Sequence, residues 1–298
     1  MKRLVALAGV LLVAGGALYL AQHRKHADEV SATALVDAAA DWQRDVTRAP
    51  LRLTRLPDEQ ESRIGDELAQ QYLSALPAPT AQRAEVESYI NHVGGRVAAH
   101  AKRKLDYRFH LIPDANLIKA FALPGGHVFV GQGLLNQMDS EDELAFVLGH
   151  EIEHIDHYHA VERVQIAAQL RNFDLGAVAD LAQIPISLWQ AGYSKDEEFE
   201  ADREGLRLAA AAGYSPQGAV NLLKRFSELD REYVIHAETP ADELSQMAIE
   251  GLEGYFRTHP LPNERLAQAN EVIADDGLDV SRPLTPLRIN SKIASEVQ

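Results

Sequence analysis

The chain has 298 residues, of which 46% are hydrophobic and 24% are charged, a composition that is typical of globular proteins and excludes disordered, collagenous and polytopic membrane classes. Its formal net charge of −15 argues against a nucleic-acid-binding surface. Cysteine is absent, which excludes disulfides, thiol nucleophiles and cysteine-ligated zinc and leaves any metal site to His, Asp and Glu.

An uncharged run of 18 residues, Leu4–Ala21, follows Lys2 and Arg3 at the N-terminus. A membrane-spanning helix needs roughly 17–25 such residues, so residues 1–25 are predicted to be a membrane anchor or a signal segment. The run offers no good cleavage site of small residues, which favours an uncleaved anchor over a cleaved signal peptide. Its basic N-terminal flank predicts that the rest of the chain lies outside the cytoplasm.

A single catalytic-sized domain is expected over residues 58–275, between a stalk or linker at 26–57 and a loose tail at 276–298. Helical periodicity dominates this domain, so the predicted fold class is mainly α with a small β-sheet (α+β). The first elements expected in chain order are amphipathic helices at Glu61–Leu76 and Ala84–Ala101, a strand at Tyr107–Ile112, and two short strands around a Pro-Gly-Gly turn within Ala120–Leu135.

Residues His150-Glu151-Ile152-Glu153-His154 form an HExxH motif. In a helix, residues four apart lie about 40° apart around the axis, so both imidazoles would face one metal ion. Glu151 would lie beside them, where its carboxylate could accept a proton from a metal-bound water. Ser140 and Glu143 form a capping-box pattern that predicts the start of this helix.

This helix is predicted to be buried, because apolar residues occur on two of its sides. Buried histidines need partners, which favours metal ligands over solvent-exposed side chains. His157 lies seven residues after His150, roughly 10 Å along the helix and too far away to bind the same ion. His157 and His159 are therefore expected to support the ligands or to lie on the surface, and the extended metzincin pattern is absent.

A catalytic zinc ion usually has three protein ligands, and the third is expected in a helix that the capping box of Ser194 and Glu197 predicts. On a helical wheel, Glu198 and Asp202 share a face with small residues, which would permit close approach of another helix. The sequence therefore predicts Glu198 as the third ligand and Asp202 as the acceptor for the outer nitrogen of a ligand histidine. The opposite face is predicted to be solvated and carries Glu197, Glu200, Glu204 and Arg207.

The HExxH motif followed 44 residues later by Glu198-Phe199-Glu200-Ala201-Asp202 resembles the gluzincin peptidases that include the CAAX prenyl protease, HtpX, the mitochondrial Oma peptidase and periplasmic BepA. The resemblance covers roughly residues 58–272 and is closest to the periplasmic BepA-like and Oma-like branch. Lys119 departs from the family, which usually has Asn at this position. Further matching stretches are Phe121–Gly126, Gly133–Leu135, Ala212–Pro216 and Thr258–Pro262.

This resemblance implies a zincin-like catalytic domain that holds one Zn²⁺ through His150, His154 and Glu198, with Glu151 as the base. It also implies a zinc-dependent metalloendopeptidase that hydrolyses misfolded or unassembled proteins outside the cytoplasm. With the N-terminal run as a single-pass anchor, the catalytic domain would lie in the bacterial periplasm. A soluble periplasmic protein is the alternative, and envelope assembly factors or chaperones are the partners to expect.

Two other function classes stay open from the sequence. One is a zinc-site chaperone or scaffold with little proteolysis, although the intact Glu151 argues against it because a structural site has no use for a base. The other is a zinc amidase acting on cell-wall material.

Peptidases of this kind bind substrate as an added strand along an exposed sheet edge. The resemblance implies that this edge is formed by Gly125, Gly126, His127, Val128 and Phe129. An ordinary core strand is the alternative for the side chains of these residues, although backbone pairing with a substrate would not depend on them.

The donor that stabilises the oxyanion stays open among Tyr193, His259 and Arg265. His259 lies between Thr258 and Pro260 in a turn that would hold its imidazole in one direction. The resemblance favours a latch at the open zinc position, with transition-state stabilisation or an ordinary turn histidine as alternatives.

Overall fold

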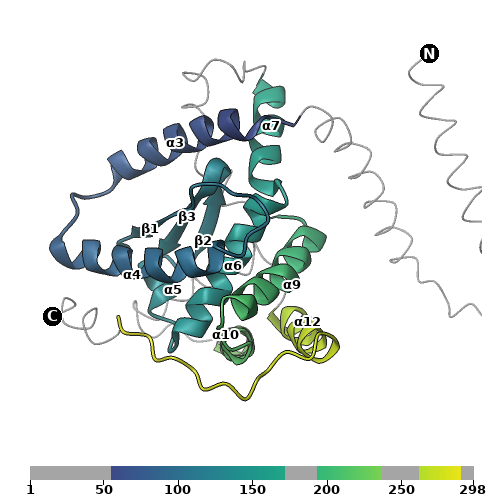
Figure 1. Ribbon diagram of the computed structural model, residues 1–298. Coiled ribbons are helices and arrows are strands. Elements are labelled where there is room, and N and C mark those ends of the chain that lie inside the picture. Colours follow the sequence, from purple (N-terminus) through teal and green to yellow (C-terminus); the bar gives the residue numbers. More distant parts are fainter. Residues whose placement is uncertain (1–54, 172–192, 237–261, 290–298) are drawn as a thin grey trace, which may run out of the picture. The chain divides into compact units, whose positions relative to one another are not determined.

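The computed structural model describes residues 55–171, 193–236 and 262–289, within a unit that begins at Leu56 (Figure 1). The expected anchor at residues 1–25, most of the linker and His259 lie outside the described residues. Within the described ranges, no helix is both long enough and apolar enough to cross a membrane. The elements are α3 (Asp58–Ala75), α4 (Ala81–Ala98), β1 (Arg108–Ile112), β2 (Ala120–Leu123), β3 (His127–Gly131), α5 (Gln132–Leu135), α6 (Glu141–Asp156), α7 (His159–Arg171), α9 (Lys195–Ala211), α10 (Gln217–His236) and α12 (Pro262–Asp275).

The three strands form one sheet in the order β1-β3-β2, so the predicted mainly helical fold with a small sheet is confirmed. Strand β3 is parallel to β1, with His127 opposite Arg108, and antiparallel to β2, with His127 opposite Leu123. The turn from β2 to β3 requires glycine, because Gly125 and Gly126 have φ angles of 75° and 104°.

The prediction that residues 125–129 offer a free sheet edge is wrong. Gly125 and Gly126 lie in the turn, while His127, Val128 and Phe129 belong to β3, the central strand, which pairs with a neighbour on each side. Strand order depends on pairing between distant segments, which a single strand's own sequence does not record. The edge strands are β1 and β2 instead.

Alternating side chains of the sheet enter two hydrophobic clusters, as the period of two along a strand requires. Val128 and Val130 of β3 join the main core, which also includes residues of α4, α6, α9, α10 and α12. Phe129 joins a smaller cluster with Ile64 of α3 and Val164 of α7. The sheet therefore lies between α3 and helix α6, which carries the HExxH motif (Figure 1).

The loose tail expected at residues 276–298 is not observed for its central part. Thr285 and Leu287 exchange backbone hydrogen bonds with the start of α6, at Glu141 and Asp139. Leu287 is buried in the main core. Burial of apolar side chains holds this segment against the domain. The stretch is too short for a hydrophobic periodicity that would have predicted this burial.

Candidate active site

Helices α6 and α9 supply the residues that the sequence singled out, and each begins at a serine cap. The Ser140 hydroxyl accepts a hydrogen bond from the backbone N–H of Glu143. At α9, Ser194 and Glu197 form the complete reciprocal capping box. These caps set the start of each helix and hence the direction in which its later side chains point.

The two helices cross closely at a pair of glycines. A Cβ atom placed on Gly205 of α9 would lie 2.6 Å from the backbone nitrogen of His150, and one on Gly149 of α6 would lie 2.6 Å from the carbonyl oxygen of Gly205. Only glycine permits this approach, since real Cβ atoms essentially never come within 3.0 Å of such atoms. The small-residue face predicted for α9 therefore packs against the HExxH helix.

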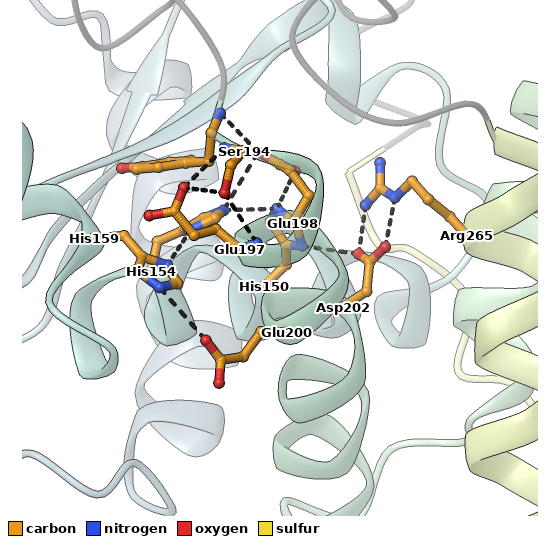
Figure 2. Close-up of polar contacts among 10 residues, drawn as sticks. His150, His154, His159, Ser194, Glu197, Glu198, Glu200, Asp202 and Arg265 are labelled. Carbon is orange, nitrogen blue, oxygen red and sulfur yellow. Dashed lines mark hydrogen bonds and ion pairs between the residues drawn. The ribbon is translucent and has the colours of Figure 1, made fainter. Parts of the chain in front are cut away.

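This crossing brings His150, His154 and Glu198 together in a buried group that could hold a metal ion (Figure 2). The Nε2 atoms of the two histidines lie 3.1 Å apart, and the Glu198 oxygens lie 3.4 Å from Nε2 of His150 and 3.8 Å from Nε2 of His154. Tetrahedral zinc with bonds of about 2.0–2.1 Å separates its ligand atoms by about 3.3–3.4 Å. The nitrogen and oxygen donors thus fit zinc in kind and in spacing.

The outer nitrogen of His150 is held by the carboxylate of Asp202. Its Nδ1–H donates to Oδ1 of Asp202 over 2.9 Å, which directs Nε2 toward His154 and Glu198. Arg265 of α12 fixes Asp202 with two hydrogen bonds of 2.6 and 2.7 Å. Burial disfavours the charged form of Asp202, but Arg265 and His150 outweigh it and lower its pKa to about 2.

The second histidine has a different environment. The Nδ1 atoms of His154 and His159 lie 3.0 Å apart, and the ring of Tyr193 stacks on His154 with the ring centroids 3.8 Å apart. Burial lowers the pKa of His154 well below its usual range. This imidazole is therefore neutral, which is the form that binds a metal ion.

Glu151 lies beside the ligand histidines and is only 3% exposed. Burial raises its pKa to about 7, although the charge of His150 opposes the shift. A carboxylate with a pKa near neutrality is well matched to take up and release a proton. Lys119 is buried immediately before β2, and its own pKa is lowered to about 8 by burial, against the attraction of Glu151 and Glu198.

The structure also places groups whose positions the sequence did not reveal. Arg265, an oxyanion candidate, binds Asp202, and Tyr193, another candidate, lies against His154. The predicted solvated face of α9 is partly wrong, since Glu197 is 7% exposed because its carboxylate binds the cap residue Ser194. Glu200, from the same face, reaches His157 and His159.

Comparison with known proteins gives the family. A model of peptidase family M48 matches residues 80–273. The chain belongs to peptidase family M48. The β-barrel assembly-enhancing protease of Escherichia coli O157:H7 is 30% identical over 230 residues, which cover 70% of this chain and 43% of the relative.

Two further relatives of this M48 chain are similar over comparable stretches. The corresponding protease of Yersinia pestis is 28% identical over 229 residues, covering 71% of this chain and 43% of the relative. The mitochondrial metalloendopeptidase OMA1 of Schizosaccharomyces pombe is 29% identical over 222 residues, covering 72% of this chain and 60% of the relative. The chain thus spans less than half of the β-barrel assembly-enhancing proteases it matches.

Proposed function

We propose that this M48 chain is a zinc-dependent metalloendopeptidase that hydrolyses misfolded or unassembled proteins of the bacterial envelope. The convergence of His150, His154 and Glu198, with the buried Glu151 beside them, carries the proposal. Bound by these three residues, Zn²⁺ would supply Lewis-acid catalysis and the activation of water near neutral pH. The relatives' names as metalloendopeptidases support the same activity.

Each neighbouring residue has a role in this reaction. Glu151 accepts the proton of the attacking water and then donates it to the nitrogen of the leaving amine. Asp202 keeps the hydrogen of His150 on Nδ1, so that its Nε2 lone pair faces the metal group. Arg265 in turn holds Asp202 in place and keeps it ionised.

The substrate strand is proposed to add to β2, the sheet edge that packs against the HExxH helix. The carbonyl of Lys119 accepts a hydrogen bond from the N–H of Gly131. The backbone N–H and C=O groups of Lys119, Phe121 and Leu123 therefore point toward β3. Ala120 and Ala122 consequently direct their N–H and C=O groups away from β3. An extended peptide could pair with those groups beside Glu151.

The cellular setting is proposed from the N-terminal run and the relatives. The run Leu4–Ala21 supports a single-pass anchor in the bacterial inner membrane with the catalytic domain in the periplasm. A soluble periplasmic form after cleavage is the alternative, and N-terminal sequencing of membrane and soluble fractions separates the two. The name of the bacterial relatives supports substrates or partners in β-barrel assembly.

The decisive experiment compares the full chain with Glu151→Gln and Glu198→Gln for zinc content and casein cleavage. Glu151→Gln should keep its zinc and lose cleavage by ~10²–10⁴-fold, because the base is gone while the ligands stay. Glu198→Gln should lose both, and Glu271→Gln, an exposed glutamate of α12, is the matched control. Cleavage of cell-wall amides without cleavage of casein would refute the peptidase assignment.

A further inference from the structure

A second group of potential metal ligands lies next to His154 and consists of His157, His159 and Glu200. His157 ends α6, His159 begins α7 and Glu200 projects from α9. Nδ1 of His157 lies 3.3 Å from Oε1 of Glu200, and Nε2 of His159 lies 3.6 Å from Oε2 of the same carboxylate. Figure 2 shows Glu200 below the histidine rings, with a dashed line running from its carboxylate up to the imidazole, while Asp202 lies to the right beside Arg265.

The spacing of these three side chains suits a metal ion. One ligand atom from each lies within 4.8 Å of the others, and the two measured separations bracket the 3.3–3.4 Å expected for tetrahedral zinc with bonds of about 2.0–2.1 Å. The side chains of His157 and Glu200 are 22% and 38% exposed, so an ion could enter from solvent. Two imidazoles and a carboxylate are donors that zinc accepts.

An independent observation is the charge at this place. Glu153 is 2% exposed, and its Oε2 lies 3.2 Å from Nε2 of His157, yet neither atom makes a hydrogen bond. Among the described residues, no Lys or Arg forms an ion pair with Glu153 or Glu200. The two carboxylates therefore face only histidines, and a divalent cation bound among these groups would be attracted by both of them.

We infer that His157, His159 and Glu200 form a second metal site, which takes Zn²⁺ more weakly than the catalytic site and inhibits the enzyme when filled. Its three ligands come from three helices, and Glu153 lies behind His157 as a further negative charge. The inhibitory part of this inference rests on the proposed function.

Inhibition follows from the hydrogen bond between the two sites. The Nδ1 atoms of His154 and His159, 3.0 Å apart, share one hydrogen. When Nε2 of His154 binds the catalytic ion, Nδ1 of His154 is the donor of this bond and Nδ1 of His159 is the acceptor. Coordination of a second ion through Nε2 of His159 would leave the hydrogen of that ring on Nδ1, where it would oppose the hydrogen on Nδ1 of His154. Each ion therefore weakens the binding of the other.

The test measures zinc per chain after equilibrium dialysis at nanomolar and at micromolar free Zn²⁺, using the full chain. The wild type should hold about one ion at the low concentration and gain about one more at the high one. His157→Asn and Glu200→Gln should not gain the second ion, because each lacks a ligand. Glu204→Gln is the matched control, since it removes a carboxylate one turn along α9 that pairs with Arg207 instead.

Casein cleavage at both zinc concentrations tests the coupling. The zinc concentration that halves activity should be ~10-fold or more higher for His157→Asn than for the wild type, on the scale of losing one supporting metal contact. The second site is refuted if the wild type binds no second ion, or if His157→Asn and Glu200→Gln take up as much zinc as the wild type. The coupling is refuted if zinc inhibits His157→Asn as strongly as the wild type. If Glu198→Gln still bound one ion at nanomolar free Zn²⁺, the catalytic ligand set would be refuted instead.

Discussion

Replacing Gly205 by alanine should separate the two helices that carry the metal ligands. The added Cβ would lie 2.6 Å from the backbone nitrogen of His150 and 2.8 Å from the carbonyl carbon of Gly149, whereas ordinary contacts begin at 3.4 Å. These neighbours are backbone atoms that cannot rotate away, so the helices must move apart by about 0.6–0.8 Å. Glu198 and Asp202 would move with α9, away from His150.

The energetic effect combines two opposing contributions. Overpacking costs about 1–3 kcal/mol, and alanine is favoured over glycine in a helix by about 1 kcal/mol. Because backbone atoms of both His150 and Gly149 crowd the added Cβ, the upper end of the overpacking cost applies. The free energy of unfolding should then fall by about 1–2 kcal/mol. The melting temperature should then fall by about 2–8 °C, and zinc should bind about 10–100-fold more weakly.

Thermal unfolding followed by circular dichroism and zinc competition with a chelator would measure both effects. Gly95→Ala is the matched control, because Gly95 is an exposed residue of helix α4 with nothing within 4 Å of an added Cβ. That variant should gain about 1 kcal/mol and keep its zinc. A Gly205→Ala protein as stable as Gly95→Ala, with wild-type zinc affinity, would refute this account of the helix crossing.

Three further predictions concern the site and its support. Asp202→Asn should lower zinc affinity about 10–100-fold, as measured by isothermal titration calorimetry. Arg265→Met should lower the affinity to a smaller extent. Wild-type affinity in both variants would show that the hydrogen bonds from His150 to Asp202 and from Arg265 to Asp202 do not support zinc binding. Because Glu151 must be ionised to act as base and burial raises its pKa to about 7, kcat/KM should fall about tenfold per pH unit on the acid side. A bound Zn²⁺ would lower the pKa of Glu151 and so oppose the effect of burial. The acid-side fall in kcat/KM should therefore be centred at or below about pH 7. A kcat/KM that stays constant down to pH 5 would contradict the role of Glu151 as base. Glu61→Ala should cost about 3–5 kcal/mol in urea unfolding, since it strips the buried Arg103 guanidinium and the N–H of Gly125 of an acceptor. A loss below about 1 kcal/mol would show that Asp58 and the carbonyl of Ile155 suffice for Arg103.

Much of the candidate site could be read from local spacing. The interval of four between His150 and His154, and between Glu198 and Asp202, places each pair on one helix face whatever the rest of the fold does. The serine caps of α6 and α9 are equally local, because they involve residues three apart. These features therefore follow from the local sequence and do not depend on the tertiary structure.

Other parts depend on contacts between distant segments. The chain turns at Tyr158, whose φ of 65° ends α6 and starts α7, so His159 returns to His154 instead of continuing along the helix. Arg265 meets Asp202 across 63 positions of sequence. Such pairings leave no periodic signal, because periodicity reports which face of an element is buried and not what buries it.

The amino-acid sequence by itself determined the helical class, the caps and the two motif-bearing helix faces, because those follow from steric and hydrogen-bonding preferences within a few residues. Only the tertiary structure decided that β3 is central and β2 is the edge, and that Glu200 joins the histidines after the motif. Strand order and side-chain partners come from the packing of whole elements around one core, where close approach at Gly149 and Gly205 selects which faces meet.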